Sequence, residues 1–392
     1  MISTIKKFFR QQKQKNQFFR DRQDQGPGFL FYAEDENSWP HLGPIITRLT
    51  EHHDKQIFYV TSSEEDPLLK TENPNIRSYY IGDGLVRTGF FQGLSETLVV
   101  MTMPSLGSMY IKKSKFPGMH HAYVQHSMIS SHLGYLPQAF DHFDTILCAG
   151  PHHVAEIRAT EAAYALPAKR LIEHGYCRLD VILADASSTP AAHRAEDAPA
   201  RVLLAPSWGD HAILETIGES LIAKLLDTGY QLTVRPHPQT AHLQPELIRA
   251  LEDQFAGHER CTFEQGVSGH ASLLASDVMI SDWSGAALEY AFGLERPVLF
   301  IDVPKKVNNP EFDRIDCTPL EVSIREKVGT VVDPNSLDEV SEAISRLVAD
   351  PAAFSQQIRQ ARAESLFNPA RAGEVGARAL LELFEELYPA RP

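Results

Sequence analysis

The chain has few cysteines and no long apolar run among its 392 residues. Its four cysteines are far apart and show no C-x-x-C spacing, so neither a disulfide framework nor a cysteine-based zinc site is indicated. No stretch approaches the apolar length of a membrane span, and the N-terminus lacks the apolar core of a signal peptide. These features predict a cytoplasmic protein.

Several common ligand-binding patterns are also missing. The chain has no G-x-x-x-x-G-K-[ST] and no G-x-G-x-x-G, which argues against a P-loop ATPase and a standard dinucleotide dehydrogenase. The adjacent pairs His52-His53 and His152-His153 lack the one-turn separation that would let both rings chelate a metal ion from one helix. We therefore expect neither metal nor cofactor. The net charge of −14 argues against a nucleic-acid partner.

The N-terminal segment 1–25 differs from the rest in charge. Its first 22 residues hold seven basic side chains, a single acid and four phenylalanines. One interpretation is a solvated or disordered basic tail. The other is an amphipathic helix attracted to anionic lipid, which would place the protein peripherally on the inner face of the plasma membrane.

From residue 26 onward, short apolar runs alternate with helical patterns, which is typical of βαβ units and a mainly parallel sheet. The pattern predicts an α/β protein with two Rossmann-like domains facing each other across a cleft. A stretch rich in Ala, Ser and Pro predicts a linker between them. Ser336 and Glu339 predict a capping box that opens a late helix. The expected boundaries are 26–184 for the first domain, 185–199 for the linker, 200–370 for the second domain and 371–392 for a C-terminal helix.

The stretch 277–302 reads as one complete βαβ unit. An apolar run at 278–280 ends in a polar turn, a helical pattern follows, and a second apolar run begins after Pro297. Ser284 and Gly285 stand where that helix begins, and its unpaired N–H groups and positive dipole end suit a phosphate. The alternative is that Ser284 is only a helix cap.

Three other predicted strands end in side chains that could contact a ligand. His126 directly follows an apolar strand and is the first domain's candidate base, although a structural histidine is the alternative. Arg235 and His237 alternate with prolines in a rigid turn and suit a phosphate, unless they are incidental solvent-facing charges. Ser207 and Trp208 follow the first strand of the second domain, where Trp208 could instead belong to the core.

Five short motifs occur in order between roughly residues 123 and 302. They are Asp144-Thr145-Ile146-Leu147, Gly175-Tyr176-Cys177-Arg178-Leu179-Asp180, Leu204-Ala205-Pro206-Ser207-Trp208, Arg235-Pro236-His237-Pro238 and Ser281-Asp282-Trp283-Ser284, the last followed by Glu289-Tyr290. Taken together, they resemble the motifs of the CDP-glycerol glycerophosphotransferase family, the teichoic-acid-type primases and polymerases with a GT-B fold.

The resemblance implies transfer of glycerol phosphate, or a related polyol phosphate, from CDP-glycerol to a hydroxyl of a cell-surface glycan or lipid-linked acceptor in envelope, teichoic-acid or capsule synthesis. His126 and His237 would be the catalytic residues, with His126 as the base. The expected substrate-binding residues are Arg235, Ser207, Trp208, Asp282, Ser284, Gly285 and Glu289.

The chain departs from the family pattern in two places. The family has the motif W-H-G-T-x-x-K in the first domain, whereas this chain has Gln125-His126-Ser127-Met128 with no nearby lysine. Gly285 replaces the second serine of the family's D-Y-S-S. The acceptor and the transferred group therefore stay open. A GT-B glycosyltransferase that uses a nucleotide sugar, with Glu289 on the ribose, is one alternative. A catalytically inactive scaffold subunit is another.

Overall fold

The computed structural model describes residues 2–23, 25–108, 111–189, 198–264 and 269–389. The chain forms two compact units, and each contains its own sheet. The first unit comprises Met1–Ser127, Tyr135–Asp180 and Leu366–Pro392. The second comprises Met128–Gly134 and Val181–Ser365. Within the described ranges, no helix combines the length and the apolar character that a membrane span requires.

The first unit is built on a seven-stranded sheet in the order β3-β2-β1-β4-β5-β6-β7, with every pair parallel. The order reverses between β1 and β4, which makes the sheet doubly wound. Its strands are β1 (Gly28–Ala33), β2 (Ile57–Thr61), β3 (Ile76–Tyr80), β4 (Thr97–Met101), β5 (Met119–Val124), β6 (Thr145–Cys148) and β7 (Arg170–Glu173).

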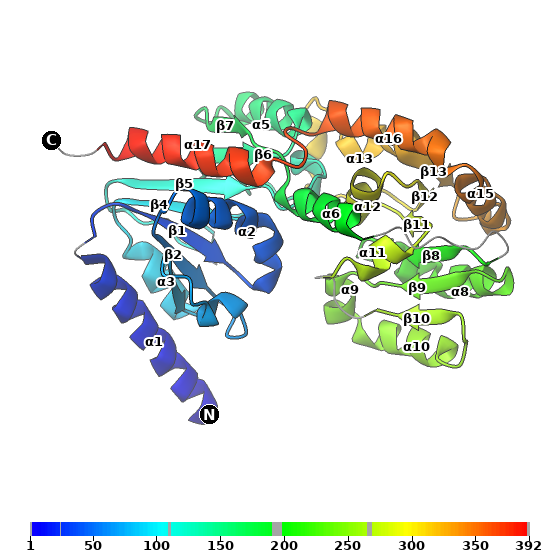
Figure 1. Ribbon diagram of the computed structural model, residues 1–392, viewed down its shortest axis with the longest axis horizontal. Coiled ribbons are helices and arrows are strands. Elements are labelled where there is room, and N and C mark those ends of the chain that lie inside the picture. Colours follow the sequence, from blue (N-terminus) through cyan, green and yellow to red (C-terminus); the bar gives the residue numbers. More distant parts are fainter. Residues whose placement is uncertain (1, 24, 109–110, 190–197, 265–268, 390–392) are drawn as a thin grey trace. The chain divides into compact units, whose positions relative to one another are not determined.

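Helices cover both faces of this sheet because the strands alternate apolar side chains between the two faces. One core holds Phe18, Phe90 and Ile157, which come from α1, α3 and α5. The other holds Leu42, Cys177 and Leu380, from α2, α6 and α17. Figure 1 shows α17 and α2 on the side of the sheet opposite α1 and α3. The helices are α1 (Ile2–Gln23), α2 (Trp39–Thr47), α3 (Leu85–Gln92), α5 (Pro151–Tyr164), α6 (Cys177–Ser188) and α17 (Ala372–Leu387), with short turns η1 (Glu36–Ser38), η2 (Arg48–His52) and η3 (Pro67–Lys70). The short helix α4 (Ser131–Gly134) belongs to the second unit.

The second unit repeats this plan with a six-stranded parallel sheet in the order β10-β9-β8-β11-β12-β13. The order reverses between β8 and β11, so the carboxyl ends of these two strands form the switch point where ligands bind in open α/β sheets. The strands are β8 (Arg201–Leu204), β9 (Gln231–Val234), β10 (Cys261–Phe263), β11 (Val278–Ser281), β12 (Val298–Ile301) and β13 (Gly329–Val332).

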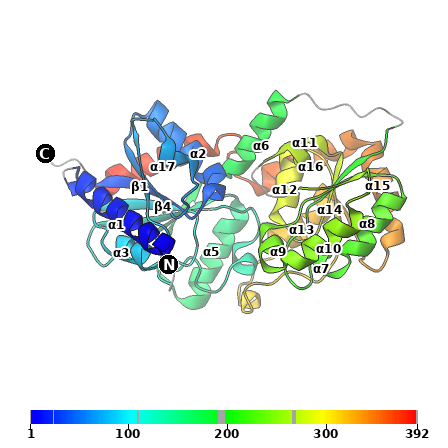
Figure 2. The ribbon, with the colours of Figure 1, turned by 90° about the horizontal axis from the view of Figure 1, so that it is seen from below.

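Helices again pack on both faces of the sheet. The core of one face contains Leu221, Ile248 and Ile344, from α8, α10 and α15. Figure 2 shows α8 and α10 on one side of this unit and α12 with α16, which contact each other, on the other. The helices are α7 (Ile213–Thr216), α8 (Gly218–Asp227), α9 (Pro238–Leu243), α10 (Pro245–Phe255), α11 (Ala271–Ala275), α12 (Gly285–Leu294), α13 (Leu320–Ser323), α14 (Arg325–Val328), α15 (Leu337–Ala349) and α16 (Pro351–Ser365), with η4 (Phe312–Arg314).

The structure corrects two local predictions. Part of the expected linker, from residue 185 onward, is helical because α6 continues to Ser188; residues 190–197 of that linker lie outside the described residues. The expected capping box is absent, since the Ser336 side chain makes no cap hydrogen bond; only its backbone carbonyl accepts one, from the Glu339 amide.

For two segments, the sequence does not predict the unit to which they belong. The short stretch Met128–Gly134, two residues after His126, packs within the second unit, where the Glu321 carboxylate accepts a hydrogen bond from the Ser130 amide at 2.9 Å. The C-terminal helix α17 packs on the first unit, against α2.

Candidate nucleotide-binding site

Three predicted ligand-binding turns of the second unit follow neighbouring strands. Ser207 and Trp208 follow β8, Arg235 and His237 follow β9, and the turn with Ser284 follows β11. Because β9, β8 and β11 are adjacent and parallel, the sheet brings all three turns to one edge, on both sides of the switch point. Parallel pairing thus gathers side chains that are up to about 80 positions apart in the sequence.

Asp282 joins two of these turns directly. Its buried carboxylate accepts hydrogen bonds from the backbone amides of Ser207 at 2.6 Å, Trp283 at 2.7 Å and Ile213 at 3.3 Å. Burial raises the pKa of Asp282, and the hydrogen bonds from Ser207, Ile213 and Trp283 oppose that shift. In this structure Asp282 fixes the shape of the binding edge; its predicted contact with substrate stays a prediction.

The turn after β11 leads into α12 with the geometry of a capped helix. Ser284 has an extended backbone, and its hydroxyl accepts a hydrogen bond from the Ala286 amide at 3.3 Å. Gly285 is the first helical residue, and Glu289 lies one turn further along. All three are partly exposed. This cap is compatible with anion binding, because one side-chain oxygen satisfies only one of the N–H groups that have no partner within the helix.

His237 and Arg235 have different roles at the end of β9. His237 caps α9, and its Nδ1 accepts a hydrogen bond from the Gln239 amide at 3.1 Å. Burial lowers the pKa of His237 to about 4, with a further contribution from the Lys306 ammonium. A neutral ring that accepts at Nδ1 carries its proton on Nε2, where it is a hydrogen-bond donor. The buried Arg235 guanidinium donates to the Gly269 carbonyl at 3.1 Å and the Ser272 hydroxyl at 3.4 Å.

Trp208, which the sequence singles out, contacts Lys306, which the sequence does not single out. Trp208 is half-buried rather than part of the core, and the Lys306 ammonium lies 3.6 Å from its ring centroid. Lys306 follows β12, the next strand in the sheet. Glu215 completes the surroundings: its carboxylate accepts a hydrogen bond from the Thr240 hydroxyl at 2.9 Å, and burial raises its pKa.

His126 lies at the carboxyl end of β5 in the first unit. Its Nδ1 is 2.8 Å from the Tyr123 hydroxyl, and the rings of His41 and Tyr135 stand edge-on to it. Burial lowers the pKa of His126 to about 4, against a hydrogen bond with the Thr102 backbone that raises it. His126 is therefore a neutral imidazole held in place by neighbouring aromatic side chains.

The motif 175–180 supports this histidine and the C-terminal helix. The Tyr176 hydroxyl donates to the His126 carbonyl at 3.1 Å. Gly175 has φ +107°, and a Cβ there would lie 2.6 Å from the Phe367 carbonyl oxygen, so only glycine fits. An Asp180 carboxylate oxygen accepts from the Gly373 amide at 3.4 Å. The motif thus holds the backbone of His126 through Tyr176 and contacts the start of α17 through Asp180.

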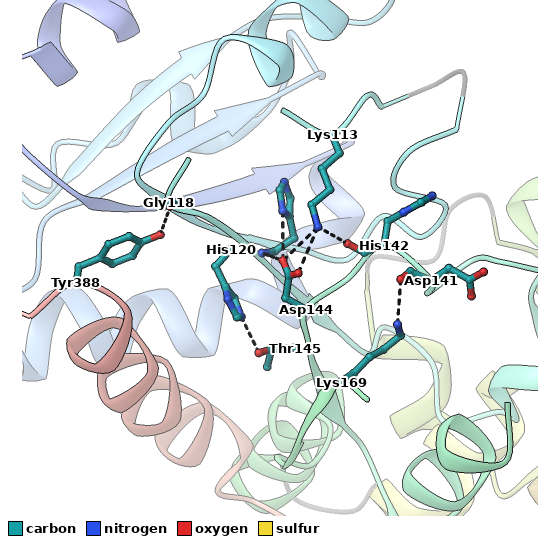
Figure 3. Close-up of polar contacts among 10 residues, drawn as sticks. Lys113, Gly118, His120, Asp141, His142, Asp144, Thr145, Lys169 and Tyr388 are labelled. Atoms are coloured by element: carbon teal, nitrogen blue, oxygen red, sulfur yellow. Dashed lines mark hydrogen bonds and ion pairs between the residues drawn. The ribbon is translucent and has the colours of Figure 1, made fainter. Parts of the chain in front are cut away.

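The other histidines near His126 in the sequence have different surroundings. Figure 3 shows His120 beside Thr145, and the two side chains lie 2.8 Å apart. His121 contacts Asp144, whose carboxylate also pairs with the Lys113 ammonium at 3.2 Å. Both belong to the start of β5, whereas His126 follows its end. His132 lies on the segment that packs with the second unit, 2.9 Å from the Ser130 hydroxyl.

No group of three or more His, Cys, Asp or Glu side chains suited to a metal ion occurs among the described residues. The site of the second unit consists of a capped helix start, cationic side chains and the neutral His237 imidazole. Such groups bind anions rather than cations, and phosphate groups best of all.

Two doubly wound units with parallel sheets of seven and six strands define the GT-B fold, as predicted. The family model for CDP-glycerol:poly(glycerophosphate) glycerophosphotransferases matches residues 125–306, which confirms the predicted resemblance over that segment. The matched segment begins one residue before His126 and ends at Lys306. It thus includes every predicted site residue. The match supports a transferase.

Solved structures show the same fold at low sequence identity. A UDP-N-acetylglucosamine 2-epimerase of Listeria monocytogenes is 13% identical with a TM-score of 0.59, covering 93% of this chain and 97% of that one. The Neisseria meningitidis enzyme bound to UDP-GlcNAc is 11% identical with a TM-score of 0.56, covering 92% and 100%. A Rickettsia africae glycosyltransferase is 10% identical with a TM-score of 0.52, covering 94% and 100%. No curated protein matches this chain in sequence.

Proposed function

We propose that this protein transfers glycerol phosphate, or a related polyol phosphate, from CDP-glycerol to a hydroxyl of a cell-surface glycan or lipid-linked acceptor. The observation that carries the proposal is the convergence of three turns at the switch point of the second sheet, all within the segment that matches the glycerophosphotransferase family. Envelope polymers such as teichoic acid or capsule are the acceptors that this chemistry implies.

The donor diphosphate would bind at the start of α12. Ser284 and Gly285 present the partly exposed helix start, whose free N–H groups and dipole favour negative charge. The neutral His237 ring donates from Nε2, while Arg235, anchored by Gly269 and Ser272, adds a fixed positive charge. Ser207, Trp208 and Asp282 shape the adjoining edge.

In the proposed reaction, His126 takes the proton from the acceptor hydroxyl. The acceptor oxygen forms a bond to the β-phosphorus, and the bond from that phosphorus to the bridging oxygen breaks. That oxygen keeps the electron pair and leaves with CMP, whose charge the cations and helix start of the second unit stabilise. Positioning and charge stabilisation supply most of the catalysis in phosphoryl transfer, and these groups provide both.

We further propose that this turnover needs no metal ion, because cationic side chains and a helix end can neutralise the leaving phosphate. Purified protein should keep its rate after dialysis against EDTA. A rate that falls in EDTA and returns with added Mg²⁺ would contradict this part of the proposal and leave the donor assignment intact.

A nucleotide-sugar glycosyltransferase is the second candidate function. Its support is the GT-B fold shared with solved epimerases and a glycosyltransferase, one of them bound to UDP-GlcNAc. In that case the helix start would hold a nucleoside diphosphate, and Glu289, one turn into α12, would bind the ribose.

One experiment separates these functions. The protein is incubated with CDP-glycerol and, in parallel, with a panel of UDP- and GDP-sugars, each with a lipid-linked acceptor. Release of CMP supports glycerophosphate transfer, whereas release of a nucleoside diphosphate supports glycosyl transfer. No release from any donor, together with His126→Ala and His237→Ala variants that behave like the wild type in every binding assay, would indicate a scaffold.

We also propose that α1 attaches the protein to an anionic membrane surface on the inner face of the plasma membrane. The helix packs on the first unit through Phe18, which is fully buried. Its N-terminal half leaves Ile5, Phe8 and Phe9 more than 40% exposed, and they are spaced to share one helical face. Basic side chains flank them. Exposed aromatic and basic side chains on one helix are the composition of interfacial helices.

A further inference from the structure

Lys306 is a cation at the binding edge that the sequence did not single out. It lies in the loop after β12, and its ammonium stands 3.6 Å from the centre of the Trp208 ring. The attraction between an ammonium and the face of an indole holds the side chain over this edge rather than in solvent. The loop therefore adds a fourth strand end to the three that carry the predicted ligand-binding residues.

The surroundings of Lys306 leave its charge available. The side chain is half-buried, and burial lowers the pKa of its ammonium to about 8, while Asp282 and Glu215 act in the opposite direction. The Trp208 ring that Lys306 overlies also lies 6.1 Å from the His237 ring, centroid to centroid, and the positive charge lowers the pKa of His237. Among the described residues, no carboxylate forms an ion pair with this ammonium, since Asp282 and Glu215 bond to neighbouring amides and to Thr240.

Arg235 differs from Lys306 in this respect. Its guanidinium already donates to Gly269 and Ser272 and so holds a loop in place. A half-buried ammonium without an anionic partner is unfavourable by itself, and a bound anion removes that cost. Lysine is also a compact point charge that meets phosphate oxygens without needing the planar geometry of a guanidinium.

We propose that Lys306 binds the phosphate groups of the nucleotide donor, next to His237 and above Trp208. This inference rests on the proposed function, because it takes a nucleoside diphosphate as the ligand of the second unit. Lys306 is a binding residue that acts on the negatively charged part of the ligand, so its contribution should grow with the number of phosphates and be absent for the nucleoside.

The test compares cytidine, CMP and CDP as ligands in isothermal titration calorimetry. Lys306→Met keeps most of the aliphatic stem and removes only the charge. A hydrogen bond to a charged group corresponds to an affinity loss of roughly 10- to 100-fold, and we expect a loss of that order for CDP. The loss should be smaller for CMP and absent for cytidine. Lys306→Ala should give the same ranking if the charge, rather than the stem, is responsible.

Lys305→Met is the matched control. Lys305 is the neighbouring residue and also places its ammonium over an aromatic ring, 4.7 Å from the centre of Phe312. It carries the same charge but does not contact Trp208. CDP affinity should be unchanged in this variant, and thermal unfolding of both variants should match the wild type, which shows that the fold is retained.

The pH dependence gives an independent readout. Groups that interact with the Lys306 ammonium are Asp282, Glu215 and His237, and His237 with its pKa of about 4 is already neutral near pH 7. CDP affinity should therefore fall as the pH rises above about 8, where the free ammonium loses its proton. In Lys306→Arg the affinity should persist, because a guanidinium stays protonated.

The possible results separate the inference from the function on which it rests. If wild-type protein binds CDP and Lys306→Met binds it equally well, Lys306 is not a phosphate ligand and the proposed function stands. An equal loss for CDP and cytidine would also overturn the inference, since it would indicate a structural role. If wild-type protein binds none of CDP, UDP or GDP, both the proposed function and the inference fail.

Discussion

The Asp282 carboxylate accepts a 2.6 Å hydrogen bond from the Ser207 amide, 75 positions earlier in the sequence. This bond joins the ends of β11 and β8, the two strands between which the order of the second sheet reverses. The switch point is thus held together by a buried carboxylate that bonds to three backbone amides. The site owes its shape to a residue that a motif comparison assigns to substrate binding.

Asp282→Asn should destabilise the protein although it preserves size and shape. An asparagine keeps one acceptor oxygen, but its NH₂ group would face an amide that now donates to the carboxylate, so one buried donor loses its partner. Breaking such a buried network costs about 2–4 kcal/mol. Urea unfolding measures this loss of stability. CDP affinity should fall as well, because Asp282 would no longer hold the turns after β8 and β11 in their relative positions.

Asp302→Asn is the control for this change. Asp302 also follows a strand of the same sheet, but its side chain is 50% exposed and pairs with Arg325 at 2.9 Å. Asp302 itself is half in solvent, although the Arg325 side chain is only 12% exposed, so Asp302→Asn should destabilise the protein less than Asp282→Asn, which breaks a fully buried network. Equal destabilisation by the two substitutions would show that the hydrogen bonds from backbone amides to Asp282 contribute no more to stability than the ion pair of Asp302.

Most strands could be predicted because they are continuous apolar runs buried on both faces. Val278–Ser281 and Val298–Ile301, for example, are each within one residue of the sequence-based expectation. The two missed strands are sheet edges, Arg170–Glu173 and Cys261–Phe263, which are partly exposed and carry polar residues. Edge strands lack the apolar pattern because one side of their backbone ladder is not covered.

Helices at composition boundaries were harder to predict. The Ala- and Ser-containing end of α6 resembles a linker in composition, yet Ala is the strongest helix former, and the helix continues to Ser188. The N-terminal helix has four phenylalanines, of which Phe18 is buried and Phe8 and Phe9 are exposed. Only the position of the helix on β3 and α3 distinguishes them, and sequence periodicity contains no such information.

The candidate site was predictable to the extent that it consists of strand ends. His126, Ser207, Arg235 and Ser284 were found because each follows an apolar run. Lys306 was not, because four residues separate it from the end of β12, and a loop of that length does not specify where its side chains point. A lysine pair after a central strand was the only signal in the sequence.

Tyr123→Phe should raise the pKa of His126. Burial raises the pKa of the Tyr123 phenol well above its ordinary value, so the phenol stays protonated. In the tautomer of His126 whose Nδ1 carries no proton, the phenol donates to that nitrogen and favours the neutral imidazole. Removing the hydroxyl frees that lone pair. If His126 is the base, the acid limb of kcat/KM should move up from about pH 4.

Tyr59→Phe provides the comparison. Its buried hydroxyl, on β2 of the same unit, donates to Asp66 at 2.9 Å, far along the chain from His126. This variant should lose stability without moving the acid limb. A limb that stays in place in Tyr123→Phe, while His126→Ala is inactive, would mean that Tyr123 does not control the basicity of His126.

Asp144 should contribute to stability at neutral pH and lose that contribution in acid. Burial raises the pKa of Asp144, but hydrogen bonds from His121 and the charge of Lys113 outweigh it and hold the pKa below its usual value. A carboxyl with a lowered pKa stabilises the fold fully above its unfolded pKa of about 4 and ceases to do so as the pH falls through the folded pKa. Asp144→Asn should cost about 1–2 kcal/mol near pH 7, because the group is partly exposed.

Asp141→Asn is the matched control for this prediction. Figure 3 shows Lys169 next to Asp141, but its ammonium contacts the backbone carbonyl, at 2.9 Å, so the substitution leaves that bond intact. Thermal unfolding from about pH 3 to pH 7 should show a reduced acid slope only in Asp144→Asn. The same slope in all three proteins would remove Asp144 as the source.

Phe8→Ser combined with Phe9→Ser should detach the protein from anionic vesicles without unfolding it. The two rings contact each other edge-on, 6.0 Å apart, and are exposed by 43% and 66%, whereas Phe18 anchors the same helix to the first unit. Burying two such aromatic rings at a bilayer surface stabilises binding by a few kcal/mol, about 1.5–3 kcal/mol for each ring that is fully buried. Flotation with phosphatidylglycerol-containing vesicles, compared with phosphatidylcholine alone, measures the effect.

Leu85→Ser, which removes an 85%-exposed apolar side chain from α3, should bind as the wild type does. If wild-type protein floats equally with both vesicles, or with neither, α1 does not recognise anionic lipid.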